Sequence, residues 1–511
     1  MPPNTSATPW TAIPASRRLL AGLALALSNF MVVLDLTIAN VSVPHIAGSL
    51  GITLDQGTWI ITSYAVAEAI CVPLTGWLAQ RFGTVRVFIV AMFGFGVFSL
   101  LCGMSVSLTM IVACRVGQGL CGGPIMPMSQ SLMMRVFPPE KRAVAMGVWA
   151  MTVILGPALG PILGGIISDE ISWHWVFLIN VPIAGLCIAA AWLLLRPVET
   201  ETLKLPIDRI GLCLLVFWIG CLQVMLDIGR DHDWFGDWKV VALAIMAAIG
   251  FLVFIIWELT EEHPVVDLRI FRHRGFSASL VTMSLAFGAF FAGVVVVPQW
   301  LQVTLGYSAT QAGIITAMHA FAAIMVAPLV AKLTEKVDGR LLISVGIGWM
   351  ALTSLFRAQW TSGVDFFGLA WPIYVQGFGI PFMMIPLTAM SLASVTPDET
   401  ASAAGLQNFV RTMAVAVATS IVLTIWGNSQ RTSRTGLVES MNVDGAQATL
   451  AGAGMTPEQS ATVLSNMVDR EAITLAVDHT FVLAALVLAI AAAIVWLSPK
   501  VKVSGPMPGG H

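Results

Sequence analysis

The chain has 511 residues, of which 57% are hydrophobic and 11% are charged, and its formal net charge is −2. A soluble domain carries roughly 25% charged residues, so this composition excludes a water-soluble globular protein and indicates a polytopic membrane protein. No basic patch or basic helix stands out, which argues against nucleic acid as a partner. The seven cysteines lie in apolar runs without a C-x-x-C pair, which predicts neither a disulfide framework nor a metal site.

Apolar runs of about 20 residues, the length that crosses a bilayer as a helix, predict an all-α chain with fourteen spans. Arg17 and Arg18 precede the first run as in a signal peptide, but that run is long and carries Asp35, which favours a retained span. We expect the spans near 19–44, 57–79, 86–106, 107–134, 141–167, 173–195, 207–228, 236–259, 275–303, 309–332, 340–359, 366–395, 400–428 and 477–498.

The basic residues segregate across this map. Of the 26 Lys and Arg, two lie within spans (Arg115 and Arg411), and six fall opposite the N-terminus (Arg230, Lys239, Arg357, Arg431, Arg434 and Arg470). The positive-inside rule therefore places both termini in the cytoplasm. The others lie on the side of the N-terminus: Arg17, Arg18, Arg81, Arg86, Arg135, Lys141, Arg142, Arg196, Lys204, Arg209, Arg269, Arg272, Arg274, Lys332, Lys336, Arg340, Lys500 and Lys502.

The two halves of the chain match each other sparsely. At one offset Gln118-Gly119 falls on Gln376-Gly377, and at a neighbouring offset Gln56 falls on Gln311 and Pro73 on Pro328. Parallel halves with a central substrate site are one architecture of secondary transporters. We therefore expect a cytoplasmic N-terminus (1–18), an N-terminal six-helix bundle (19–195), two inserted spans (207–259), a C-terminal six-helix bundle (275–498) and a cytoplasmic tail (499–511).

One outside loop of the C-terminal bundle, 429–476, is long. Thr456 and Pro457, followed by Glu458 and Gln459, form a helix-start pattern. The loop is predicted to contain a small extracytoplasmic helix, and the alternative is a disordered spacer.

Asp35 lies well inside the first span. A carboxylate at that depth costs about 2.5–3.5 kcal/mol, so it predicts a proton or cation site on a transport path. Arg115 lies inside the fourth span of the same bundle and is a plausible partner. A proton on Asp35 would weaken that pair and favour another helix arrangement, whereas the alternative is a static buried ion pair.

Three further ionisable residues lie within spans. Glu68 in the second span could carry a second proton or bind cationic cargo. His319 aligns with Tyr64 in the repeat and could face the same cavity. Arg411 could attract an anionic group of a substrate. For each of the three, a structural role is the alternative.

The fifth span carries a glycine–proline pattern that suits close helix packing and a local bend. It fits a rocking interface that resists proton leak, and the alternative is core packing alone. Its members are Gly156, Pro157, Gly160, Pro161, Gly164 and Gly165.

Two methionine-bearing stretches are related by the repeat, and their polarizable side chains suit promiscuous apolar binding. We expect them to face each other across a substrate site, with ordinary packing as the alternative. The candidates are Met126, Met128, Met383 and Met384, with polar contacts from Asn40, Gln130, Gln407 and Asn408.

Several of these motifs carry a family resemblance along nearly the whole chain. The stretch 34–41 (LDLTIANV) with Pro44, the fourth-span RVGQG at 115–119, the fifth-span GPALGP at 156–161 and WHWVF at 173–177 resemble the fourteen-span drug/proton antiporters of the major facilitator superfamily. The loop 76–83 (GWLAQRFG) is also similar, but it carries Gln80 where the superfamily usually has an aspartate, which puts a cytoplasmic gating latch in doubt.

The resemblance implies a major facilitator fold, with two six-helix bundles plus two central spans. It also implies a proton-coupled exporter of lipophilic toxic compounds in the bacterial inner membrane, with no cofactor besides protons. A periplasmic adaptor protein and an outer-membrane channel would be its partners, alongside membrane lipids. A proton-coupled carrier of a specific metabolite or fatty acid would share this fold. No H-E-x-x-H or G-x-S-x-G motif points to an enzyme.

Overall fold

The computed structural model describes residues 13–203, 206–229, 234–396 and 399–499. These residues form helices and no strand, so the all-α prediction is confirmed. Twelve helices are long and apolar enough to cross a membrane, or up to fourteen if each of two bent pairs is one span. Lys204, Arg230, Lys500 and Lys502, which entered the charge count, lie outside the described residues.

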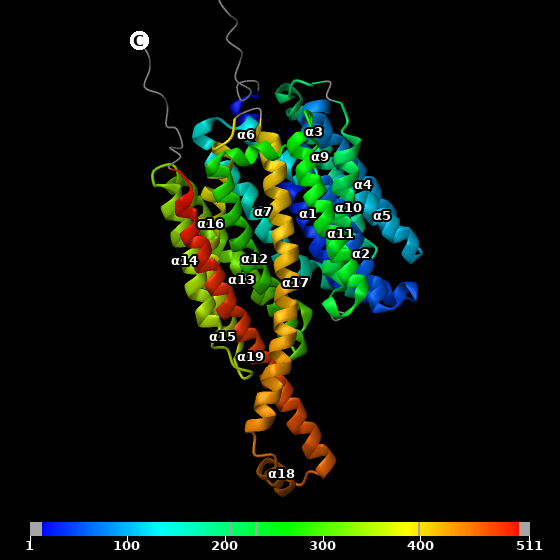
Figure 1. Ribbon diagram of the computed structural model, residues 1–511, viewed down its shortest axis with the longest axis vertical. Coiled ribbons are helices and arrows are strands. Elements are labelled where there is room, and N and C mark those ends of the chain that lie inside the picture. The colour runs from blue at the N-terminus through cyan, green and yellow to red at the C-terminus, as the bar shows by residue number, and fades with distance from the viewer. Residues whose placement is uncertain (1–12, 204–205, 230–233, 397–398, 500–511) are drawn as a thin grey trace, which may run out of the picture.

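The N-terminal half begins with α1 (Ala15–Leu50), which lies along α7, and α2, which lies along α5 (Figure 1). The second span bends by 56° between α2 and α3, where the sequence places Pro73. The remaining helices complete the bundle: α2 (Leu54–Cys71), α3 (Thr75–Phe82), α4 (Thr84–Gly103), α5 (Leu108–Gly122), α6 (Ile125–Val136), α7 (Pro139–Ile166), α8 (Trp175–Leu178) and α9 (Asn180–Leu194).

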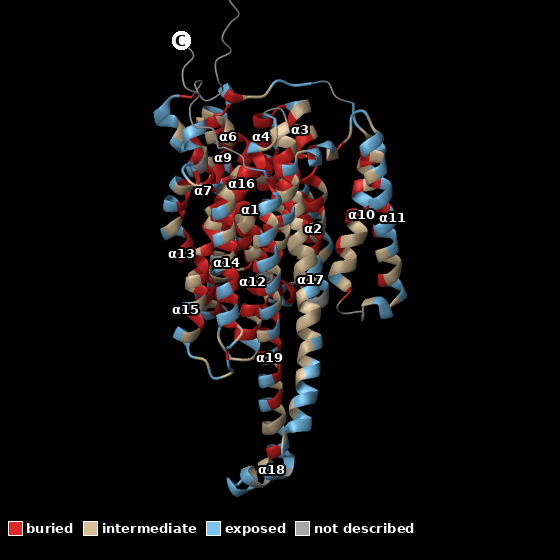
Figure 2. Ribbon diagram, turned by 60° about the vertical axis from the view of Figure 1, so that its left-hand side comes forward, coloured by how far each residue is buried: buried red, intermediate tan, exposed pale blue. Residues whose placement is uncertain are grey.

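The inserted pair, α10 (Arg209–Ile228) and α11 (Trp238–Thr260), stands at the edge of the molecule, where α10 packs on α2 and α17 (Figure 2). Much of its surface is exposed and apolar, which suits contact with lipid. The C-terminal half then comprises α12 (Arg274–Val303), α13 (Ala309–Thr334), α14 (Gly339–Arg357), α15 (Phe366–Gly377), α16 (Gly379–Ala393), α17 (Thr400–Ser440), α18 (Val443–Gly452) and α19 (Pro457–Ile494).

The repeat is visible in the way corresponding helices begin. Thr53 and Gln56 form a capping box at the start of α2, and Ser308 and Gln311 form the same box at the start of α13. In each box the hydroxyl accepts a backbone N–H while the glutamine side chain accepts the backbone N–H of the capping residue. The two aligned glutamines therefore make equivalent capping hydrogen bonds in the two halves.

The long outside segment is more ordered than the sequence predicted. Helix α17 continues from the membrane-crossing region to Ser440, α19 begins at Pro457, and the short α18 joins them at the tip (Figure 1). Thr456 caps α19 with a capping box to Gln459. The expected loop is thus a projecting helical hairpin, because polar helix-forming residues extend both spans beyond their apolar parts.

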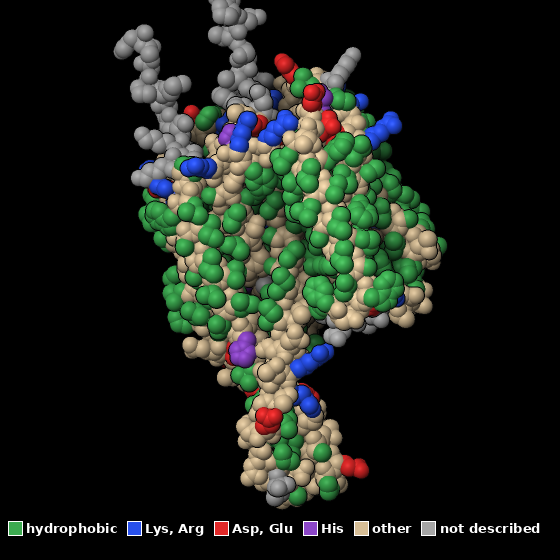
Figure 3. Space-filling view, in the orientation of Figure 1, with side chains coloured by type: hydrophobic (Ala, Val, Ile, Leu, Met, Phe, Trp, Pro, Cys, Tyr) green, Lys and Arg blue, Asp and Glu red, His purple; other side chains and the backbone are tan. Residues whose placement is uncertain are grey.

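The surface separates into an apolar middle and charged ends (Figure 3). Lys and Arg gather at the end opposite the hairpin, and the hairpin carries both signs of charge. Where the two halves meet near the basic end, Gly76 of α3 packs on Ser402 of α17, and Gly147 of α7 packs on Ile385 of α16. These contacts join the halves at the end that the charge distribution predicts to be cytoplasmic.

Candidate functional site

Asp35 and Arg115 form an ion pair inside the N-terminal half, and neither side chain is exposed to solvent. The Arg115 Nη1 lies 2.6 Å from Asp35 Oδ2, and its Nε donates to the carbonyl of Ile60 at 3.0 Å. Asp35 Oδ1 also accepts amide N–H groups from Gln118 at 3.0 Å and Asn180 at 2.6 Å. Three N–H donors thus point at the two oxygens of this carboxylate.

A shell of neighbours fixes this pair. The Ser99 hydroxyl accepts from both Gln118 and Asn180, and it donates to the carbonyl of Phe177 at 2.8 Å. The Tyr64 ring lies under the Arg115 guanidinium, 4.2 Å from its centroid. Both carboxylate oxygens of Asp35 therefore have hydrogen-bond donors inside a buried network.

Glu68 is the second acid, one turn after Tyr64 on α2. Its side chain is buried, with 7% of the residue exposed, and the described structure gives its carboxylate no hydrogen-bond or ion-pair partner. The strongest charge acting on it is Arg411 of α17, from the opposite half of the molecule. Glu68 therefore differs from Asp35, whose carboxylate accepts three described hydrogen bonds.

Arg411 is buried between the halves. Its Nη2 lies 2.7 Å from the sulfur of Met126, and its guanidinium lies 5.6 Å from the ring centroid of Phe287 and 6.0 Å from that of Trp149. The residue thus links the acid on α2 to the aromatic side chains of α7 and α12.

The glycines of the fifth span form the contact of α7 with α1. Gly156, Gly160 and Gly164 recur every four residues, so they share one face of the helix. A side chain on Gly164 would meet the carbonyl of Ile38 at 3.0 Å, and the Thr37 hydroxyl donates to the carbonyl of Gly156 at 3.1 Å. The missing side chains let the two backbones touch, next to Asp35.

The other members of that pattern face the C-terminal half. A Cβ built on Gly165 would lie 3.8 Å from the Thr310 hydroxyl of α13, and Pro161 packs beside Gly313 of the same helix. The helix bends by 46° between the segments that end at Pro157 and begin at Leu159. The bent helix therefore contacts α1 with one face and α13 with the other.

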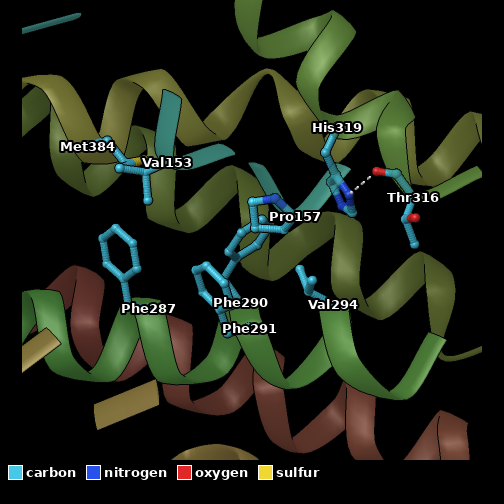
Figure 4. A pocket seen from close by; sticks show the side chains of 9 residues that line it. All are labelled: Val153, Pro157, Phe287, Phe290, Phe291, Val294, Thr316, His319 and Met384. Atoms are coloured by element: carbon cyan, nitrogen blue, oxygen red, sulfur yellow. Dashed lines mark hydrogen bonds between the residues drawn. The ribbon is translucent and has the colours of Figure 1, made fainter. Parts of the chain in front are cut away.

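A pocket between the halves is lined almost entirely by apolar side chains (Figure 4). His319 and Thr316 of α13 supply its polar groups, Met384 comes from α16, and Val153 and Pro157 come from α7. Phe287, Phe290, Phe291 and Val294 of α12 form the opposite wall. The lining therefore offers mainly apolar surface, with few groups for directed hydrogen bonds.

Some predicted site residues lie near this pocket and others do not. Gln130 of α6 accepts an amide N–H from Asn408 of α17 at 2.6 Å, which joins the two halves. Met128, Met383 and Gln407 are buried in the packed interior and do not line the pocket, whereas Asn40 is exposed on α1. The two methionine stretches lie on helices that pack mainly on other partners, since α6 packs mainly on α1 and α17, while α16 packs mainly on α14.

Sequence reasoning missed a second polar network, in the C-terminal half. Arg357 was counted as an outside residue, but only 2% of it is exposed, and its Nη1 donates to Gln376 Oε1 at 2.5 Å. Gln376 Nε2 donates to the Ser354 hydroxyl at 2.9 Å, and His319 Nε2 lies 2.9 Å from Gln376 Oε1. The alignment of Gln376 with Gln118 was the available signal, because Gln118 also joins an arginine to a serine.

Solved structures share this fold at low sequence identity. The human organic anion transporter MFSD10 (TETRAN) aligns with a TM-score of 0.56 at 14% identity, covering 93% of this chain and 100% of that one. A bacterial homologue of the human lysosomal transporter Spinster, in an inward-facing occupied conformation, aligns with a TM-score of 0.53 at 18% identity, covering 95% of this chain and 97% of that one.

Curated relatives are similar over nearly their whole length. The multidrug export protein EmrB of Escherichia coli (strain K12) is 40% identical over 496 residues, 96% of this chain and 97% of that protein. The fatty acid resistance protein FarB of Neisseria gonorrhoeae is 38% identical over 494 residues, with the same coverage. The profile of the Major Facilitator Superfamily matches residues 25–419. This multi-pass membrane protein therefore belongs to the Major Facilitator Superfamily.

Proposed function

We propose that this protein is a proton-coupled exporter of lipophilic toxic compounds and acts on several drugs. The observation that carries the proposal is the placement of Glu68: a buried carboxylate without a described partner, acted on by Arg411 of the other half. Arg411 in turn contacts the aromatic wall of an apolar pocket. The names of the relatives, a multidrug export protein among them, support the same reading.

In this mechanism the proton and the cargo favour different arrangements of the helices, so binding of one opposes binding of the other. A proton on Glu68 removes its attraction to Arg411, which frees that guanidinium and loosens the contact between α2 and α17. A proton on Asp35 would break the pair with Arg115 and loosen α1 from α5. Either change favours the rearrangement that exposes the pocket on the opposite side, and release of the proton to the cytoplasm resets it.

Contacts between the two halves fit such a cycle. Gln130 and Asn408 form a hydrogen bond across the halves, and Gly76 and Gly147 pack across them near the basic end. With α1 held on α7 by Gly156, Gly160 and Gly164, the two helices would move as one rigid unit. Rigid-body rocking of two halves around a central site is the expected motion for parallel-repeat transporters.

The test is efflux of ethidium driven by an imposed pH gradient in proteoliposomes, with the intact protein, Glu68→Gln and Asp35→Asn compared. We expect the intact protein to pump and Glu68→Gln to bind ethidium without pumping. If the intact protein moves no ethidium, the multidrug proposal fails. If both variants pump as well as the intact protein, neither acid carries the coupled proton.

We propose further that the chain lies in a bacterial inner membrane with both termini in the cytoplasm, and that its hairpin docks a periplasmic adaptor protein. The adaptor would in turn engage an outer-membrane channel. The hairpin projects well past the membrane-crossing region, an Arg434–Asp469 ion pair ties α17 to α19, and Val438 and Met467 are exposed on it.

Deletion of 441–456 with a short Gly-Ser closure should spare pH-driven efflux in vesicles and abolish drug resistance in cells. Resistance that survives the deletion would contradict the docking role. The matched control is Gly436→Ala, which keeps the hairpin and meets nothing within 4 Å, so it should leave resistance unchanged.

A narrow carrier of one metabolite or fatty acid is the second candidate, and the similarity to a fatty acid resistance protein favours it. It differs from the first in cargo range and in the direction of flux, which everted vesicles measure. A transporter needs no catalytic residue, and we assign none to this chain.

A further inference from the structure

Arg357, at the end of α14, is a buried cation for which the described residues offer no anionic partner. One terminal nitrogen donates to the amide oxygen of Gln376, while Nε and Nη2 find no hydrogen-bond partner. The guanidinium rests against the rings of Phe481 and Trp360, at 4.0 and 5.1 Å from their centroids. Aromatic faces offset only part of the loss of hydration, so the site favours an added anion.

In the N-terminal half, a carboxylate neutralises the arginine of the corresponding arginine–glutamine–serine network. Arg115 also donates to a repeat-related glutamine, and that glutamine also donates to a serine hydroxyl. There, however, Asp35 completes the ion pair. In the C-terminal half the glutamine and the serine, Gln376 and Ser354, are present, and the carboxylate is not.

Acids on the neighbouring helices are engaged elsewhere or stand apart. Asp365 caps α15 by accepting the backbone N–H of Gly368, and Glu471 bonds to Ser362. Asp478 lies one turn before Phe481 on α19 and forms no ion pair with Arg357 in the described structure. The charge on Arg357 therefore has no described counterion from any helix packed around it.

The open side of the guanidinium faces α12 at a glycine. A Cβ built on Gly293 would lie 3.7 and 3.8 Å from Nη2 and Nη1 of Arg357. Gly293 follows Phe290 by three residues and directly precedes Val294, and both line the pocket (Figure 4). A carbon atom placed there would thus sit in ordinary contact with the unpaired nitrogen, so the glycine keeps this approach to Arg357 clear of a side chain beside the apolar pocket.

His319 connects the same network to the pocket. Its Nε2 lies 2.9 Å from Gln376 Oε1, the oxygen that accepts from Arg357, and its Nδ1 lies 3.1 Å from the Thr316 carbonyl. The Gln376 amide nitrogen donates to the Met350 carbonyl and to Ser354, which holds the amide oxygen toward Arg357. His319 therefore lies between the Arg357 network and the pocket that it lines.

We propose that Arg357, Gly293 and His319 form an anion-binding site for the carboxylate of a lipophilic acid, whose apolar chain lies against Phe287, Phe290 and Phe291. This inference rests on the proposed export function and assigns a binding site to the acidic members of its lipophilic cargo. The carboxylate supplies the charge that Asp35 supplies in the other half. Lipophilic cations gain nothing from this site.

The test measures binding of dodecanoate and of ethidium to the purified full chain, with their transport in proteoliposomes. Arg357→Gln should weaken dodecanoate binding at least tenfold and leave ethidium binding within twofold. Gly293→Asp places a carboxylate beside Arg357, so it should weaken dodecanoate binding similarly while raising the thermal unfolding temperature. Gly293→Asn has the same size without the charge and is the matched control: by filling the space it should also weaken dodecanoate binding, but it should not raise the unfolding temperature.

Several results would overturn the site. Dodecanoate binding that is unchanged in Arg357→Gln would do so, and so would an equal loss of both ligands, which indicates a purely structural arginine. Displacement of dodecanoate by chloride at equal concentration would assign the site to an inorganic anion instead. If the intact protein pumps ethidium but does not bind dodecanoate, this inference fails and the export function stands. If it binds dodecanoate but does not pump ethidium, the anion site stands and the export function fails.

Discussion

The buried Asp35–Arg115 pair gives the sharpest prediction, which concerns Asp35→Asn. The carboxylate accepts Arg115 on one oxygen and the amides of Gln118 and Asn180 on the other. The new amide has one acceptor and one donor group. In either orientation, therefore, its NH₂ faces a donor, and Arg115 loses its counterion.

Breaking a buried ion pair by removing one partner costs about 3–5 kcal/mol, because the remaining charge is left uncompensated. Since neither side chain is exposed, water cannot solvate the remaining charge, and we expect the free energy of unfolding to fall by an amount in that range. Such a loss lowers the folding equilibrium constant by roughly two to four orders of magnitude.

The assay is denaturant and thermal unfolding of the purified protein in detergent. Arg115→Met added to Asp35→Asn should recover at least half of the lost stability, because replacing a whole buried ion pair by apolar groups is often close to neutral. The double variant should still fail to couple transport to protons if the pair has a coupling role. A single variant within about 1 kcal/mol of the intact protein would refute the reasoning, and so would a double variant less stable than the single one.

Three further predictions follow from the site. Glu68→Gln should keep ethidium binding within about threefold and lose at least about 90% of pH-driven efflux, as fluorescence assays would measure; efflux unaffected by the change would exclude Glu68 as the carrier. Gly160→Ala should destabilise by about 1–3 kcal/mol, because its Cβ would collide with Thr37, whereas Gly185→Ala, which meets nothing within 4 Å, should not; equal unfolding curves would contradict this. A double-mutant cycle on Gln130→Ala and Asn408→Ala should give a coupling energy of about 1 kcal/mol, and zero coupling would show that their bond across the halves adds nothing.

The sequence predicted the parts of this protein that depend on hydropathy and on buried charge. Apolar runs of span length must form helices in lipid, because no other open structure satisfies the backbone there, and the helices follow. An acid and an arginine inside spans of one bundle had to find each other or water, so Asp35 and Arg115 could be paired before their distance was known.

Features that depend on three-dimensional direction were not predictable in the same way. Arg357 ends its helix and read as a loop residue, but its long side chain turns inward to Gln376. Met383 and Met384 are equally good candidates by residue type, yet successive positions point 100° apart on a helix, and only Met384 reaches the pocket. The helix start at Thr456 and Pro457 was predicted, but the continuation of both spans into a projecting hairpin was not, because those extensions are polar.

The two halves therefore share one arrangement of arginine, glutamine and serine, but among the described residues only the arginine of the N-terminal half is paired with a carboxylate. Each joins an arginine to a glutamine and a serine, which fixes the guanidinium and leaves one side of it free for an anion. The N-terminal half fills that side with Asp35, and in the proposed mechanism a proton on Asp35 would open the pair. The C-terminal half has Gly293 beside its arginine, so under the proposed anion site its charge balance would depend on the bound cargo. Such a division would let one half respond to protons while the other responds to cargo.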